Sequence, residues 1–492
     1  MKRLSIWSTI VLLLVALTAT SQTKVVVLSD IHVMAPELLV NDGKAFQDHI
    51  TSNRKVDEFS RELFDVMVDR LKNSIKPDWL FITGDLTKDG ERLSHEYVAA
   101  KLGELRQAGI RTLIVPGNHD WGTDNALYYD GDETRPAERA SGALLEQLYG
   151  DYGLGSQSER FGTTLNYVTE PVEGLTVIGI DSGTEGVLSS EALDWVCNKA
   201  SEAFGKGQRV IALMHHALIP HITGAEKLPI AKAVISDYET VRNRLADAGV
   251  SAVFTGHLHF TDNAKDFNAD LTESIYDIAT GALETWPSHY RIMTLSSDLK
   301  ELSLETYRIS TLPSTPDFDS RAKQRLENFI ENELRSVSSG GTLMKTAMNI
   351  AVPLAQEAVV AYASGNEHLN SDAADLMDTF NNLVTLANLI PQVNSMLSEY
   401  GLTMTDVKNA AHSVLENKTS CGITGRETVV DDLSLTIPLR AKQGEETAIR
   451  TWEPDRTMQS DDAFYTLQGF RIAKPVRTGL YIRNGRLVLI GN

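Results

Sequence analysis

Short apolar runs alternate with amphipathic stretches along the first three hundred residues. The apolar runs have the length of buried strands, and they lie at Val25–Leu28, Trp79–Ile82, Leu113–Val115, Val177–Ile180, Val210–Met214, Val250–Phe254 and Ile275–Ile278. Between them the apolar residues have helical spacing, at Val56–Leu71, Tyr97–Leu105, Ser190–Ala203 and Tyr238–Ala248. This alternation predicts an α/β fold in which helices cover a buried sheet.

The pattern changes after residue 312, where Pro313 and Pro316 lie in a linker rich in serine and threonine. Proline and small polar residues between periodic segments indicate a boundary. The segment that follows has helical periodicity and predicts a small bundle of four helices. The first begins near Asp319, and the others are expected at Leu343–Ala363, Ala373–Tyr400 and Thr405–Leu415.

A third type of pattern begins at Cys421 and continues to the end of the chain. Apolar and polar residues alternate over Leu433–Ile437, and two apolar runs flank Asn484-Gly485, which is typical of a β-hairpin. The sequence therefore predicts a main α/β domain over residues 22–312, a helical domain over residues 313–420 and a small β-rich segment over residues 421–492.

The first 21 residues have the layout of a secretory signal peptide. Lys2 and Arg3 precede the apolar run Ile10–Leu17, and Ala19–Ser21 offers a cleavage site before Gln22. The run is too short to span a bilayer comfortably, and no later stretch is long and apolar enough for a transmembrane helix. We therefore expect an exported protein, periplasmic or secreted, with residues 1–21 removed.

The charge and the cysteines narrow the classes of partner. The formal net charge is −20 and becomes −22 when Lys2 and Arg3 are removed with the signal. This acidic balance argues against a nucleic-acid-binding surface, which needs a basic patch. Cys197 and Cys421 are the only cysteines, too few for a metal site of their own. They form either one disulfide after export or two free thiols, and we favour free thiols.

Polar side chains with the chemistry of metal ligands follow five of the expected strands. These exits carry Asp30 and His32, Asp85, Asn118 with His119 and Asp120, His215 with His216, and His257 with His259. In open α/β sheets, ligand sites form beyond the carboxyl ends of the strands. We therefore expect all five exits to lie at one edge of the fold.

The donor types indicate which metals suit such an edge. Carboxylate, imidazole and amide oxygen ligands without thiolate suit Mn, Fe or Zn, and there are enough of them for two ions. Of 12 histidines, only His368 and His412 lie beyond residue 290. The sequence therefore predicts two divalent or trivalent metal ions, held by the first part of the chain.

The order Asp30-x-His32, Gly84-Asp85, Gly117-Asn118-His119-Asp120, His215 and Gly256-His257-x-His259 resembles the calcineurin-like metallophosphoesterases. The resemblance covers roughly residues 24–309 and implies a two-sheet α/β sandwich. It implies that one metal is held by Asp30, His32, Asp85 and His259. The second would be held by Asp85, Asn118, His215 and His257, with Asp85 bridging.

The resemblance also implies roles for the remaining residues of the site. His119 would contact the phosphate and transfer a proton, supported by Asp120. We favour His215 over His216 as the ligand, with His216 near the substrate. The expected chemistry is hydrolysis by a metal-bridging hydroxide, with small phosphodiesters such as cyclic nucleotides or glycerophosphodiesters as the first substrate class. Phosphomonoesterase activity and non-catalytic phosphate recognition are the alternatives.

Some residues depart from the family pattern or are open to a plainer interpretation. Lys88 stands where purple acid phosphatases carry a tyrosine ligand, which argues against a tyrosinate-coordinated iron. Thr87 to Asp89 either line the substrate pocket or form a solvated loop, and His95 is expected on a helix surface.

The region after residue 312 resembles the helical appendage of some bacterial relatives similar to class III cyclic-nucleotide phosphodiesterases. We expect it to shield an edge of the catalytic sheet; the alternatives are that it narrows the pocket or supports a homodimer.

Overall fold

The computed structural model describes residues 22–155, 157–222, 233–336 and 342–365, with shorter pieces at 395, 397–398, 401–416, 419–420, 427–428, 431–442, 464–465, 471–472, 479–483 and 486–490. Contacts divide the chain into two compact units, Met1–Ala441 and Lys442–Asn492. The expected signal peptide, most of the expected helix at Ala373–Tyr400, and Cys421 lie outside the described residues. Cys197 is buried and carries a free thiol.

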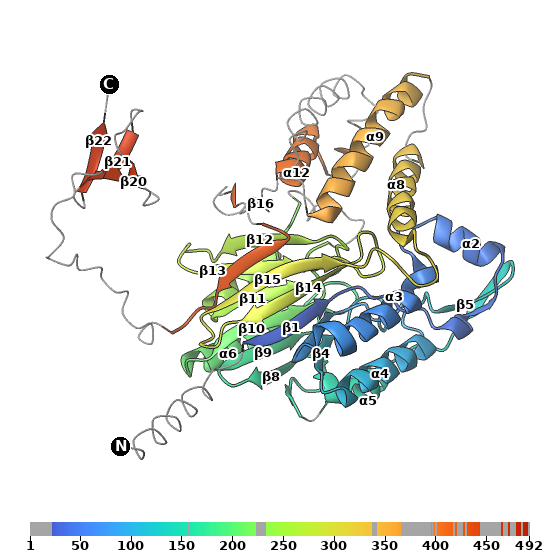
Figure 1. Ribbon diagram of the computed structural model, residues 1–492, viewed down its shortest axis with the longest axis horizontal. Helices are drawn as coiled ribbons and strands as arrows, with labels where there is room; N and C mark the ends of the chain where they lie inside the picture. The colour runs from blue at the N-terminus through green and yellow to red at the C-terminus, as the bar shows by residue number, and fades with distance from the viewer. Residues whose placement is uncertain are drawn as a thin grey trace, which may run out of the picture. The chain divides into compact units, whose positions relative to one another are not determined.

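Two mixed sheets form the centre of the first unit (Figure 1). The first contains, in spatial order, β18 (Ser434–Pro438), β15 (Glu301–Arg308), β14 (His289–Leu295), β1 (Thr23–Leu28), β3 (Trp79–Thr83) and β4 (Arg111–Val115). The second contains β12 (Asp262–Phe267), β13 (Ser274–Ala279), β11 (Val250–Thr255), β10 (Arg209–Met214), β9 (Leu175–Ile180), β8 (Tyr167–Val172) and β7 (Glu159–Arg160). All seven predicted strands are therefore confirmed.

Parallel pairing determines where the strands end. In the first sheet β1 pairs with β3 and β3 with β4, each in parallel. In the second, β9, β10, β11 and β13 are parallel neighbours. The outer strands are antiparallel, with β14 beside β1 and β12 beside β13. The fold is thus the α/β type with mixed sheets, and the carboxyl ends of the central strands in each sheet point the same way.

The central strands contain long apolar runs, as is typical of strands that are covered on both faces. Val25, Val26, Val27 and Leu28 are each at most 1% exposed, and burying such a side chain contributes about 1.5–3 kcal/mol relative to leaving it in water. One large apolar cluster includes residues from both sheets, Ile82 of β3 and Leu213 of β10 among them. The shared core is what holds the two groups of strand ends in a fixed relation.

Helices cover the outer faces of the two sheets (Figure 1). The described helices of residues 22–312 are α2 (Lys44–Thr51), α3 (Asp57–Arg70), α4 (Arg92–Gln107), α5 (Gly142–Tyr149), α6 (Ser190–Gly205) and α7 (Tyr238–Asp247). Helix α4 packs on β4, α6 packs on β9 and β10, and α7 packs on β11 and β13. Short strands β2 (Leu39–Asn41), β5 (Leu127–Asp130) and β6 (Glu133–Pro136) form a small separate sheet. The four predicted helices of this region are confirmed.

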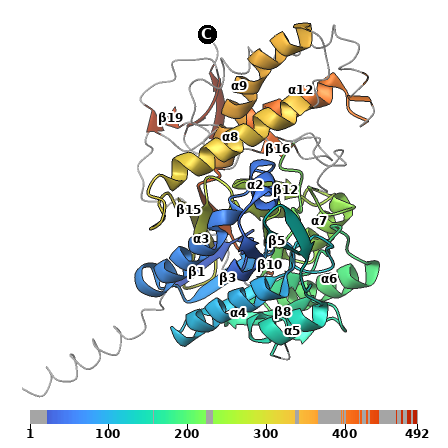
Figure 2. The same ribbon diagram turned by 90° about the vertical axis from the view of Figure 1, so that its right-hand side faces the viewer.

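Among the described residues beyond the linker there are three further helices: α8 (Phe318–Ser336), α9 (Thr342–Ser364), which contains Pro353, and α12 (Met404–Glu416). Helix α9 packs against both α8 and α12 (Figure 2). Short strands β16 (Thr419–Ser420) and β17 (Glu427–Thr428) come next. In the described part of the chain, no helix combines the length and apolarity needed to cross a membrane.

Strand β18 returns to the first sheet and pairs with β15 in antiparallel fashion, Ile437 lying opposite Leu302. It covers the β15 edge of the first sheet. The expected role of the whole region after residue 312 stays a prediction. In the second unit, β21 (Gly479–Arg483) and β22 (Arg486–Ile490) form the predicted hairpin, with β19 (Phe464–Tyr465) and β20 (Arg471–Ile472) beside it.

Candidate metal centre

The predicted ligands lie in the loops that begin where the parallel strands end. Asp30 and His32 follow β1, Asp85 follows β3, Asn118 follows β4, His215 follows β10, and His257 and His259 follow β11. The parallel pairing brings the exits of one sheet together, and the shared core brings the two sheets together. All seven side chains belong to one connected group of contacts, as described next.

One set of four side chains converges on a common point. The ligand atoms of Asp30, His32, Asp85 and His259 all lie within 4.8 Å of one another, and all four residues are buried. His259 Nε2 lies 3.4 Å from Asp30 Oδ1, and His32 Nε2 lies 3.4 Å from Asp85 Oδ2. Two imidazole nitrogens and two carboxylate oxygens at this spacing form a metal-binding site.

A second set adjoins the first and shares one of its atoms. His215 Nε2 lies 3.3 Å from Asp85 Oδ2, the same oxygen that faces His32. Asn118 Oδ1 lies 2.9 Å from both His215 Nε2 and His257 Nδ1. Asp85 therefore stands between two groups of donor atoms.

The hydrogen-bond inventory indicates that both groups suit a cation. Asp30 Oδ1 and Asp85 Oδ2 are buried and have no hydrogen-bond partner among the described residues. His215 Nδ1 lies 2.8 Å from the carbonyl oxygen of Thr83, so Nδ1 carries a hydrogen and donates it. In the neutral ring, Nε2 then points a lone pair at two acceptors, Asp85 Oδ2 and Asn118 Oδ1. A cation between these atoms removes that conflict, so the residues fit a metal.

The electrostatics of His215 lead to the same conclusion. Although burial acts in the opposite direction, the carboxylates of Asp85 and Asp30 raise the pKa of His215 to about 9. The position therefore favours positive charge next to the ring.

The backbone is strained at five of the seven ligands. The φ angles are 47° at Asp30, 40° at His32, 50° at Asp85, 65° at His257 and 64° at His259. Positive φ in a residue other than glycine costs about 1–3 kcal/mol and persists only where the surroundings enforce it. Hydrogen bonds between the loops hold the backbone in this conformation. The amide of Asp30 donates to the carbonyl of Gly84, and the amide of His32 donates to the carbonyl of Asp85.

Three glycines of the motifs allow the loops to approach closely. A Cβ on Gly84 would overlap the His215 ring, and one on Gly117 would overlap the backbone and carboxylate of Asp85. A Cβ on Gly256 would overlap Ser29 and Asp30. Each glycine therefore stands where a side chain would push a ligand out of position.

His119 lies beside the metal-binding site but is not among the clustered donors. Its ring centroid is 5.0 Å from that of His32, and its side chain is 28% exposed, whereas the His32 side chain is fully buried. Its Nδ1 lies 2.8 Å from Asp89 Oδ1, and its backbone amide donates to Asp85 Oδ1 at 2.8 Å. His119 thus lies at an open side of the site, where His257 is partly exposed as well.

The expected support of His119 by Asp120 is wrong. Asp120 Oδ2 accepts from the amide of Gly117 at 2.8 Å, and its Oδ1 accepts from the amide of Thr87 at 3.0 Å. The turn folds this carboxylate back onto its own loop, so Asp120 holds the loop and Asp89 orients the imidazole. Asp89 also pairs with Lys88. Although burial raises it, the partners His119 and Lys88 lower the pKa of Asp89 to about 2.

The structure bears on three other interpretations from the sequence. The solvated-loop interpretation of residues 87–89 is wrong, since Lys88 is 2% exposed and Asp89 8%. His95 is not on the surface: it is fully buried, its Nδ1 2.9 Å from the Tyr149 hydroxyl. His216 is buried, with its ring centroid 4.4 Å from that of His257 and its Nδ1 2.7 Å from Ser182 Oγ, and its expected place near the substrate stays a prediction.

Asp89→Asn is expected to lower kcat by about 10–100-fold, because a neutral amide orients and balances the imidazole less well than a carboxylate. Metal content is expected to stay unchanged, since Asp89 touches no clustered donor. Steady-state kinetics with metal analysis checks this. Asp266→Asn, at a buried carboxylate paired with Arg242 in β12, serves as the control for general disturbance; equal loss of activity in both variants would contradict the role of Asp89.

Sequence reasoning left the role of Asp89 open and missed Thr285 and Lys55. Thr285 Oγ1 lies 2.9 Å from His259 Nδ1 and orients that ligand, and Lys55 Nζ lies 3.1 Å from His32 Nδ1. Only Asp89 left a readable signal, as a carboxylate four residues after Asp85. The other two come from loops whose course the sequence pattern does not reveal.

Comparisons with known proteins agree with this picture. Residues 23–260 match the family model described as calcineurin-like phosphoesterase. Among curated proteins, none matches the chain. Similar solved structures include a dimetal phosphatase from Danio rerio, with 14% identity over 58% of this chain and 96% of that one, at a TM-score of 0.40.

Two further solved structures are similar over part of the chain. The Thermus thermophilus sulfate thiohydrolase SoxB in complex with glycerol has 12% identity over 63% of this chain and 60% of that one, at a TM-score of 0.31. A double mutant of Vps29 from Entamoeba histolytica has 13% identity over 60% of this chain and 95% of that one, at a TM-score of 0.23.

Proposed function

Residues 23–260 belong to the calcineurin-like phosphoesterase family, and from this premise we propose that the chain, a metallophosphoesterase, hydrolyses small phosphodiesters at a dinuclear metal centre. The observation that carries the proposal is the position of Asp85 Oδ2. This buried oxygen has no hydrogen-bond partner among the described residues and lies 3.4 Å from His32 Nε2 and 3.3 Å from His215 Nε2. One set of donors lies on each side of it, as a bridging ligand requires.

The residues divide the work between holding metal and moving protons. Asp30, His32, Asp85 and His259 would hold one ion, and Asp85, Asn118, His215 and His257 the other. When bound, two cations supply Lewis acidity that neutralises phosphoryl charge and makes water acidic enough to act as a nucleophile. Asp89 holds Nδ1 of His119, so Nε2 is the nitrogen that can pass a proton to the leaving alkoxide.

The chemistry of the ligands supports Mn, Fe or Zn. A tyrosinate-coordinated iron is not part of the proposal. The position at which purple acid phosphatases carry the tyrosine ligand is occupied by Lys88, which is buried and paired with Asp89. Export to the periplasm or the medium is part of the proposal; it rests on residues 1–21, and the mass of the mature protein, beginning at Gln22, tests it.

The metal-loaded protein is expected to hydrolyse a bis-aryl phosphate with a kcat/KM at least about tenfold above that of the matching mono-aryl phosphate, a difference of roughly 1.4 kcal/mol in transition-state stabilisation. The reason is that a monoester brings a second negative charge to a chain that is already strongly acidic. Side-by-side kinetics with one leaving group measures the ratio. Faster turnover of the monoester would instead support a phosphomonoesterase.

The alternative from another class is a non-catalytic module that recognises phosphate. Two features argue against it: the donor sets are complete, and His119 is oriented at the open side. Full metal content without turnover of either ester would favour this alternative.

A further inference from the structure

Arg54 is a cationic side chain next to the metal centre that the family motifs do not include. It lies in the loop between α2 and α3, and its Cζ is 5.5 Å from the centroid of the Phe260 ring. The residue is partly buried, and within the described part of the chain it has no hydrogen bond or ion pair. The five N–H groups of its guanidinium therefore have no acceptor within hydrogen-bond distance among the described residues, although the buried Glu284 carboxylate acts on its charge.

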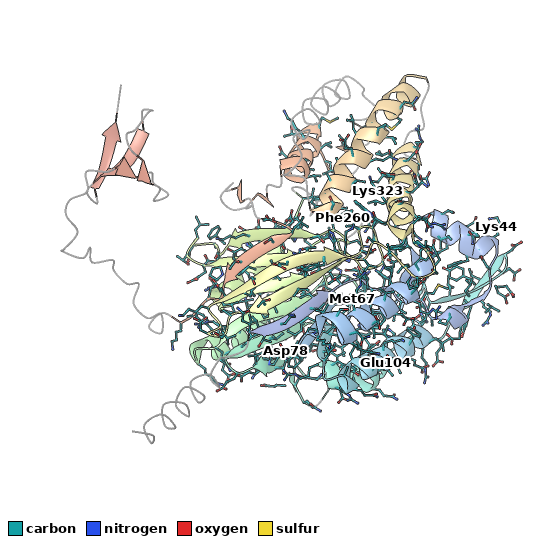
Figure 3. The ribbon with its side chains drawn as sticks, in the orientation of Figure 1. Lys44, Met67, Asp78, Glu104, Phe260 and Lys323 are labelled. Carbon is teal, nitrogen blue, oxygen red and sulfur yellow. The ribbon has the colours of Figure 1, made fainter. Side chains whose placement is uncertain are left out.

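The loop that carries Arg54 lies against the metal ligands. The next residue, Lys55, places Nζ 3.1 Å from His32 Nδ1. Phe260 directly follows the ligand His259, and Figure 3 labels it where α9 meets the sheets. The charge of Arg54 acts on both Asp30 and His259. The guanidinium is thus close to the first set of donors.

Other arginines with little exposure have internal partners. Arg242 donates to Asp266, Arg291 to two backbone carbonyls, and Arg325 to Glu58. A partly buried guanidinium without any acceptor is unfavourable unless an anion completes it. Its planar array of donors matches the oxygens of phosphate.

The aromatic side chains around Arg54 hold it in this place. The Phe260 ring packs edge-on against the Tyr362 ring of α9, with centroids 5.3 Å apart. The Tyr362 hydroxyl donates to Asp262 Oδ2 at 2.7 Å. Helix α9 therefore fixes Phe260, and Phe260 supports the guanidinium.

We propose that Arg54 binds a non-bridging oxygen of the substrate's phosphoryl group. The inference rests on the proposed hydrolase function but not on the preference for diesters. It also gives the helices after residue 312 a part in the site, because Tyr362 positions the ring on which Arg54 lies.

The test uses the metal-loaded full chain and inorganic phosphate as the probe. Arg54→Ala is expected to weaken phosphate binding, measured by calorimetry, by about 10–100-fold, and Arg54→Lys by less. Metal content and the thermal midpoint are expected to stay at wild-type values. Arg321→Ala removes an exposed arginine of α8 that pairs with Asp317, and is expected to change nothing.

Phosphate affinity that is equal in Arg54→Ala and the wild type would overturn the proposal. The proposal would also be overturned if both Arg54→Ala and Arg54→Lys lost their metal, because Arg54 would then be needed for the structure of the metal centre. Since phosphate binding is measured without turnover, these results are separable from failure of the diesterase proposal, which would appear only in the ester kinetics.

Discussion

Asp85→Asn is expected to remove bound metal and activity together. Its Oδ2 faces both donor sets and its Oδ1 accepts from the His119 amide. Asparagine keeps the size and an acceptor for that amide but loses the charge that both cations need. We expect kcat/KM to fall by more than about a thousandfold, since the loss exceeds that of a single transition-state donor.

Metal analysis and thermal unfolding with and without metal check this expectation. The wild type is expected to gain stability on metal addition and the variant to gain little. Without metal, Asp85→Asn is expected to be less stable than the wild type at neutral pH, because the His215 ring, whose pKa the Asp85 carboxylate raises, loses its main anionic partner. Asp181→Asn is the matched control: Asp181 also follows a parallel strand but caps Gly183 outside the donor sets. Retained activity in Asp85→Asn would contradict the two-metal mechanism.

Gly117→Ala is expected to damage the centre without touching a ligand's chemistry. The added Cβ would overlap the backbone nitrogen and the carboxylate of Asp85, and no side-chain rotation can relieve a clash with backbone. We expect the folded state to lose about 1–3 kcal/mol and metal affinity to fall as Asp85 shifts.

Gly103→Ala serves as a control, because it is expected to raise the stability that Gly117→Ala lowers. Gly103 lies inside α4, and a Cβ there would meet nothing within 4 Å. This substitution is expected to stabilise the protein by about 0.5–1 kcal/mol through helix propensity. Denaturant unfolding of both variants measures the change in the free energy of unfolding, which is expected to be negative for Gly117→Ala and positive for Gly103→Ala. A Gly117→Ala protein with wild-type stability and metal content would show that the close approach of the two loops is not needed.

The strand exits were readable because the parallel strands are buried on both faces. Such strands leave long apolar runs in the sequence, and the polar residues after them stand out. The antiparallel β15 was missed although Glu301–Arg308 alternates between exposed and buried positions along its first half. Alternation is the weaker signal when charged residues interrupt it. The partner of β18 was unreadable, since a strand pattern does not name its neighbour.

Local errors have local physical causes. His95 was expected on the exposed surface of a helix. Helix α4 starts at Arg92, and this puts His95 on the buried face with Val98 and Leu102. The support of His119 by Asp120 was an implication of the family resemblance. The turn after Gly117 directs its carboxylate to the Gly117 amide instead.

Strand β18 has a consequence for the order in which the chain folds. The chain leaves the first sheet at Arg308 and returns to it only at Ser434. During synthesis, the N–H and C=O groups of the β15 edge therefore stay unpaired until a strand that is made much later is available. An exposed edge is a template for pairing with other chains. A fragment that ends at the linker would keep every proposed metal ligand and still present this open edge, so completeness of the site and completeness of the fold are reached at different points along the chain.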